Sequence, residues 1–122
     1  NSYKWGSLFR SGTIIPGGSD APIESPNPIE GIYAAVTRKN SSGFPKDGWQ
    51  PSQCLSINQA IRMYTEWPAH ASFQESFRGK IKPGFRADFS VLSQNLSSIH
   101  SEEILSTKVL FTIVNGKLVY SS

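Results

Sequence analysis

The sequence predicts an α/β fold in two parts: a mainly helical part over residues 1–75 and a small antiparallel sheet over residues 76–122. In the first part, apolar residues recur three and four positions apart, which is the spacing of one helix face. After Gly79 the apolar residues alternate with polar ones, which is the period of a strand. Near the end, Asn115-Gly116 separates two such runs and is the strongest short indication of a hairpin.

The first predicted elements are a short helix and one buried strand. Trp5, Leu8 and Phe9 lie three and four positions apart, and Gly12 is well placed to end the helix. The run from Thr13 to Pro16 is short and apolar, which is typical of a strand buried on both faces.

Capping residues predict two further helices. Asn27-Pro28-Ile29-Glu30 has the residue types preferred at the N-cap and the first turn, and Ser56-Ile57-Asn58-Gln59 is a second capping box. Residues 40–54, between the two helices, are rich in Ser, Gly, Pro, Asp and Asn, which indicates a loop. The apolar stripes of these helices are Ile29, Ile32, Tyr33 and Val36 in the first, and Ile57, Ala60, Ile61 and Tyr64 in the second.

The second part of the chain predicts three strands. The alternation places Ala87, Phe89 and Val91 on one face, and Asp88, Ser90 and Leu92 on the other. The run from Val109 to Val114 is β-branched and aromatic, and Lys117 to Tyr120 is the return strand of the hairpin. One strand among helices cannot form a sheet, and a sheet of two or three strands is marginal alone. We therefore expect each part to belong to a larger architecture.

The composition narrows the class of protein. The net charge is only +3, and the single cysteine, Cys54, excludes an internal disulfide framework and a paired-cysteine zinc site. No apolar run approaches the ~20 residues that cross a bilayer, so no membrane partner is predicted. The chain begins at Asn1 and its one methionine is Met63, so we expect it to be a piece of a longer protein. Nothing in the sequence indicates a compartment.

A loose basic cluster lies at the start of the second part of the chain. It comprises Arg78, Lys80, Lys82 and Arg86, interleaved with Phe77, Phe85 and Phe89. Basic residues among aromatic ones are typical of nucleic-acid binding, whereas a solvated basic turn gives the same pattern. Because no nucleic-acid motif accompanies the cluster, we favour the turn and predict no nucleic-acid partner.

The candidate catalytic residue is Asp20. It lies in Gly17-Gly18-Ser19-Asp20-Ala21-Pro22, directly after the apolar run Thr13-Ile14-Ile15. Barrel enzymes present catalytic side chains at the ends of strands, and glycines let a ligand or metal approach the backbone closely. The alternative is that Asp20 only caps a turn before Pro22.

Three blocks of sequence carry a family resemblance. They are Gly18-Ser19-Asp20-Ala21-Pro22 with Asn27-Pro28 and Gly31 to Arg38; Ala60 to Thr65; and Gly79 to Leu92, completed by Thr112 to Tyr120. In their order and spacing, the chain resembles the C-terminal portion of the metal-dependent amidohydrolase superfamily, in the amidohydrolase family 3 branch that includes N-substituted formamide deformylases.

The resemblance implies a fold and a role for Asp20. It implies a (β/α)8 TIM barrel joined to a composite β-sandwich built from both ends of the chain. Residues 1–75 would be the last βα unit of the barrel, with strand eight at about 13–19, and residues 76–122 the C-terminal strands of the sandwich. Asp20 would be both a metal ligand and the catalytic proton carrier. The cofactor implied is a divalent metal, zinc, whose histidine ligands lie outside this segment, so the segment alone is not expected to bind it tightly.

The remaining titratable residues are expected to have other roles. His70 is expected on a helix surface or in packing, and His100 in a solvated loop. They form no His-x-His pair and cannot build a zinc site with Asp20 unaided. Asp88 recurs across the family, and we expect it at a turn or strand entry rather than in catalysis.

Two functional hypotheses follow from the resemblance. In the first, the parent is a hydrolase that cleaves non-peptide C–N bonds of a small amide or formamide-like substrate with metal-activated water, and the segment alone is inactive. In the second, the chain is a non-catalytic relic or a partner-binding or assembly module. Ile14, Ile15 and the helical stripe from Ile29 to Val36 are expected to leave exposed apolar patches, so we also expect self-association.

Overall fold

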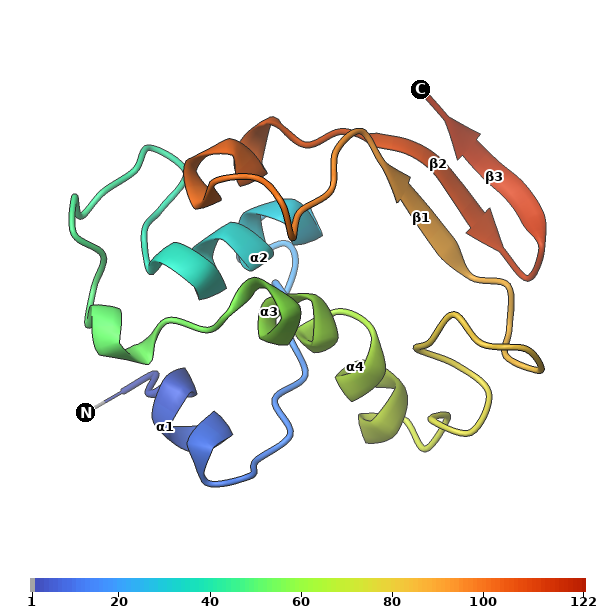
Figure 1. Ribbon diagram of the computed structural model, residues 1–122, viewed down its shortest axis with the longest axis horizontal. Coiled ribbons are helices and arrows are strands. Elements are labelled where there is room, and N and C mark those ends of the chain that lie inside the picture. The colour runs from blue at the N-terminus through green and yellow to red at the C-terminus, as the bar shows by residue number, and fades with distance from the viewer. Residues whose placement is uncertain (1) are drawn as a thin grey trace.

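The computed structural model describes residues 2–122 and places the helices at one end and an antiparallel sheet at the other (Figure 1). The helical elements in chain order are α1 (Trp5–Arg10), α2 (Pro28–Thr37), the 3-10 helix η1 (Pro51–Gln53), α3 (Ile57–Met63) and α4 (Glu66–Ala71). They are followed by β1 (Phe89–Leu92), the 3-10 helix η2 (Ser101–Ser106), β2 (Val109–Val114) and β3 (Lys117–Ser121). The mixed α/β class is therefore confirmed.

The predicted capping residues begin their helices. The Asn27 side chain accepts a hydrogen bond from the Ile29 N–H (3.1 Å), which starts α2. Ser56 and Gln59 exchange both bonds of the capping box at the start of α3. Glu30 differs from a capping-box residue, because its carboxylate accepts from the Asn27 side chain (3.3 Å) and leaves the N-cap backbone N–H to the Ser25 hydroxyl.

The core lies between α2, α3 and η2. The stripe of α2 is covered by α3 and η2, and Ile104 of η2, only 1% exposed, is its most buried large side chain. The expected apolar patch on α2 is therefore wrong: Ile29, Ile32 and Tyr33 are buried by elements of this chain itself. Burying these side chains contributes about 1.5–3 kcal/mol each.

Residues 13–19 do not form the predicted strand. They have no regular secondary structure, and none of the three strands in the described residues pairs with them. A β-strand is defined by backbone hydrogen bonds to a neighbouring strand, and no strand of the described residues lies beside this segment. The Gly17 N–H donates instead to the carbonyl of Met63 (2.8 Å), which fastens the segment to the end of α3.

The sheet has the order β1-β2-β3, with antiparallel pairing throughout. Asn115 and Gly116 connect β2 to β3 with φ values of 51° and 76°, so the predicted hairpin is confirmed with the two positive φ angles of a type I′ turn. A register shift between Val91 and Leu92 ends the predicted alternation in β1. Because of that bulge, Leu92 is half-buried while Val91 is 40% exposed.

Exposed apolar side chains gather on the sheet. All of β3 is exposed, and it pairs with β2 along one edge only. The exposed apolar side chains of the sheet are Val91, Phe111, Val114, Leu118, Val119 and Tyr120. Within residues 2–122, no helix has the length and apolarity to cross a membrane.

Candidate functional site

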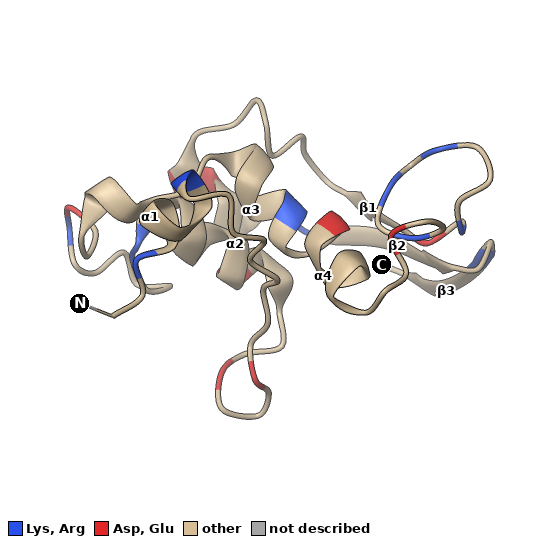
Figure 2. Cartoon of the chain, turned by 90° about the horizontal axis from the view of Figure 1, so that it is seen from below, with Lys and Arg blue, Asp and Glu red and all other residues tan. Residues whose placement is uncertain are grey.

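Asp20 lies at the start of an exposed turn in the loop that leads into α2, and that loop projects from the helices (Figure 2). Its carbonyl accepts the Ile23 N–H (2.9 Å), so backbone atoms close the turn. Within residues 2–122 its carboxylate accepts no hydrogen bond, which is not what a turn-capping aspartate does. Asp20 also has φ of 52°, a conformation that non-glycine residues adopt uncommonly and that is found at functional sites.

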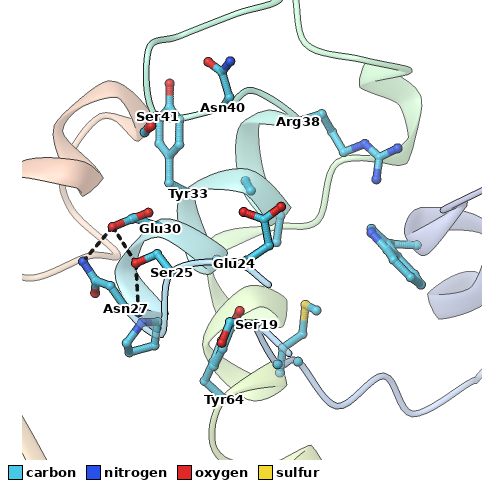
Figure 3. A pocket seen from close by; sticks show the side chains of 18 of the residues that line it. Ser19, Glu24, Ser25, Asn27, Glu30, Tyr33, Arg38, Asn40, Ser41 and Tyr64 are labelled. Carbon is cyan, nitrogen blue, oxygen red and sulfur yellow. Dashed lines mark hydrogen bonds between the residues drawn. The ribbon is translucent and has the colours of Figure 1, made fainter. Parts of the chain in front are cut away.

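An open pocket of about 800 Å³ lies beside this turn. Residues 17–19, which precede Asp20, form part of its wall, with the first turns of α2 opposite. Figure 3 shows polar side chains from the turn and from α2 pointing into it. Among them, the Glu30 carboxylate accepts hydrogen bonds from Ser25 Oγ (3.1 Å) and Asn27 Nδ2 (3.3 Å). No sequence pattern identifies Ser25 as a site residue, since its contact with Glu30 depends on how the loop folds back onto α2.

Tyr64, directly after α3, lines the pocket. Its side chain is half-buried, and this burial raises the pKa of its hydroxyl, so the phenol is neutral at neutral pH. The Cζ end of the ring lies close to both Gly17 and Gly31 of α2. Helical spacing predicts Tyr64 as part of the apolar stripe of its helix, and nothing in that spacing indicates a pocket residue.

Arg38 lies at the other end of the pocket, directly after α2. It is only 9% exposed and has φ of 58°. Its Nε donates to the carbonyl of Trp49 (2.9 Å), and its guanidinium stacks over the Trp49 ring at 4.7 Å. Its Nη2 is buried and finds no acceptor within residues 2–122. Burial lowers the pKa of Arg38, and burial also raises the pKa of the nearby Cys54 thiol.

The other titratable residues have the structural positions expected of them. His70 lies in α4, with Nδ1 3.6 Å from a Glu75 carboxylate oxygen, and His100 precedes η2, where its N–H donates to Glu103 (2.9 Å). Asp88 stands at the entry to β1. Its carboxylate accepts the Asn115 N–H of the hairpin turn (2.7 Å), which is a structural role.

The described residues do not form a metal site by themselves. Across residues 2–122, no three side chains of His, Cys, Asp or Glu come close enough to hold an ion together. Asp20 contributes at most one carboxylate, whereas a catalytic zinc takes three protein ligands and keeps a fourth position open. Any metal centre that uses Asp20 requires ligands from beyond these residues.

Comparison with known proteins identifies one family and three similar proteins. A family model described as "Amidohydrolase family" matches residues 1–120. YtcJ of Bacillus subtilis (strain 168), which is named as a putative amidohydrolase, is 39% identical to this chain. The match covers 98% of this chain and 22% of the length of YtcJ. An N-substituted formamide deformylase of Arthrobacter pascens is 34% identical over 93% of this chain and 20% of its own. Protein LONG AFTER FAR-RED 3 of Arabidopsis thaliana is 36% identical over 98% of this chain and 20% of its own.

The chain thus spans about a fifth of the length of the curated relatives it matches. No solved structure gives a significant match to it.

Proposed function

Because this chain belongs to the amidohydrolase family, we propose that it is the C-terminal part of a hydrolase that cleaves C–N bonds other than peptide bonds, and that Asp20 is a catalytic residue of that enzyme. The observation that carries the proposal is the state of the Asp20 carboxylate. It is exposed, without a hydrogen bond within residues 2–122, on a turn of uncommon backbone conformation beside a pocket. A carboxylate with no structural role in an exposed turn is available for chemistry.

We propose that residues 1–75 complete a (β/α)8 barrel and that residues 76–122 complete a composite β-sandwich. The unpaired segment 13–19 supports this, because it begins with the apolar run Thr13-Ile14-Ile15, as a barrel strand would, but has no strand beside it. The uncovered edge of β3 also indicates a surface that further chain would cover.

The proposed role of Asp20 is proton transfer. Its carboxylate takes a proton from the attacking water and returns it to the departing amine, which is a poor leaving group until it is protonated. The family is in general metal-dependent. A divalent ion would lower the pKa of a bound water molecule from 15.7 to about 7. In this proposal Asp20 is also one ligand of that ion, and the remaining ligands lie elsewhere in the parent.

The proposed substrate is a small amide or formamide-like molecule. The support is the similarity to the N-substituted formamide deformylase, whose name states such a substrate.

The test is turnover of N-substituted formamides and simple amides by the full-length parent and its Asp20→Asn variant. The isostere keeps the shape and removes the proton acceptor, so we expect kcat to fall by about 10²–10⁴-fold. Asp47→Asn is the matched control, since Asp47 is also an exposed aspartate in a loop, and its kcat should stay at the wild-type value. Unchanged kcat in Asp20→Asn would refute the catalytic role. A full-length parent that binds metal in no assay and turns over no amide would favour a non-catalytic relic or assembly module.

A further inference from the structure

The ring of Tyr64 fills a gap that two glycines leave open. A Cβ built on Gly31 would overlap the Tyr64 hydroxyl oxygen and lie 2.7 Å from its Cζ, and a Cβ built on Gly17 would lie 3.1 Å from the same Cζ. Neither glycine has a positive φ, so the backbone conformation does not require glycine at either position. What requires glycine is the space that the aromatic ring occupies.

Three segments meet at this ring. Gly17 belongs to the segment that leads to Asp20, Gly31 lies in the first turns of α2, and Tyr64 follows α3. The Gly17 N–H donates to the carbonyl of Met63, the residue before Tyr64 (2.8 Å). Gly17 is therefore held both by this hydrogen bond and by the packed ring of Tyr64. Figure 3 shows Tyr64 at the same end of the pocket as Ser19, which precedes Asp20.

The turn that carries Asp20 has few other attachments. From position 20 to position 28 every residue is exposed, so little packing within this chain fixes the turn. The contacts at residue 17 are therefore the nearest firm anchor on its N-terminal side.

We propose that Tyr64 is a positioning residue for catalysis: its ring sets the spacing between the segment before Asp20 and α2, and so fixes where the Asp20 carboxylate is presented. This inference rests on the proposed catalytic role of Asp20. The ring carbons Cζ and Cε2 lie near both glycines, so the ring is the part of Tyr64 that both contacts share, and the hydroxyl oxygen adds a further contact at Gly31. A misplacement of about 1 Å in a catalytic group costs up to about 10²-fold in rate.

The test is a double-mutant cycle in the full-length parent. Tyr64→Ala removes the ring, and we expect kcat to fall by about 10- to 100-fold with KM changed less than about threefold. Gly31→Ala displaces the ring and should also lower kcat. The double variant should be no slower than Tyr64→Ala alone, because the added methyl then has space. Tyr64→Phe keeps the ring and should retain the wild-type kcat.

Ile61→Ala is the matched control. Ile61 is also half-buried and lies in α3, but it does not line the pocket, so its variant should lower the melting temperature and leave kcat unchanged. As a readout independent of turnover, Tyr64→Ala should speed amide hydrogen exchange about tenfold or more at Gly17, whose N–H donates to the Met63 carbonyl, and Tyr64→Phe should not.

The outcomes separate the two proposals. If Asp20→Asn abolishes turnover while Tyr64→Ala and Gly31→Ala keep the wild-type kcat, the positioning role alone is wrong. If Ile61→Ala loses kcat to the same extent, the ring serves only stability and the inference is overturned. If Asp20→Asn turns over at the wild-type rate, both proposals fall.

Discussion

A single ion pair joins the end of α2 to η2. Lys39 Nζ donates to a carboxylate oxygen of Glu102 (2.9 Å), and the Tyr33 hydroxyl donates to the other oxygen (3.4 Å). The hydrogen bond from Lys39 and its positive charge lower the pKa of Glu102, and the same bond raises the pKa of Lys39. These contacts hold η2, and with it the buried Ile104, against α2.

The shifted pKa of Glu102 predicts a pH-dependent stability. Its folded pKa lies below its unfolded value, so its contribution is present above the unfolded pKa and is lost as the pH falls through the folded one. We expect Glu102→Gln to lower the melting temperature slightly at pH 7, and we expect this difference to shrink as the pH falls through the lowered folded pKa and to vanish at about pH 2. Thermal unfolding followed by circular dichroism at both pH values checks this, with Glu24→Gln as the control. A difference that persists in full at about pH 2 would contradict the assignment.

At the scale of elements, the Ser56 cap is the contact to test. The Ser56 hydroxyl accepts the Gln59 N–H, one of the amide donors that the first turn of α3 leaves without a partner inside the helix. Ser56→Ala should reduce the free energy of unfolding by about 1 kcal/mol. Denaturant titration measures this, and Ser122→Ala is the control, since that serine is exposed at the end of β3. Equal stability of the two variants would show that the cap contributes nothing.

Elements set by local sequence could be predicted. The caps at Asn27 and Ser56 and the hairpin at Asn115 depend on residues within a few positions of each other, and the structure has all three. The 3-10 helices could not be predicted, because η2 (Ser101–Ser106) is held by the distant Lys39 and by burial of Ile104 rather than by a periodic pattern.

Elements that need a distant partner also differ from the prediction. Residues 13–19 form no strand within this chain because a strand needs a neighbouring strand to pair with, and none of the described strands lies beside them. The faces of β1 exchange at Leu92 because a bulge is fixed by the register against β2. In the same way, Asp20 could be identified as a candidate from its motif, whereas the approach of Tyr64 to Gly17 and Gly31 joins segments far apart in the sequence and is visible only in the folded chain.

At the scale of the whole molecule, the exposed sheet predicts that the isolated chain self-associates. The edge of β3 has free backbone donors and acceptors, and its exposed Leu118 and Val119 are apolar, which favours pairing with a second chain. We expect sedimentation velocity to show species larger than 13.4 kDa that grow with concentration. Leu118→Lys should reduce this association, and Ile23→Lys, on an exposed loop far from the sheet in sequence, should not. A chain that stays monomeric at about 100 μM would contradict the prediction.

The place of Tyr64 in the chain also sets an order of events during translation. Ribosomes add about 5–20 residues per second, so Asp20 and both glycines emerge seconds before the tyrosine that packs between them. In that interval α2 already has its own cap at Asn27, but the turn before it lacks the ring and the Met63 carbonyl that fasten it. The most exposed part of the proposed catalytic centre is therefore completed only after Tyr64 has been added to the chain.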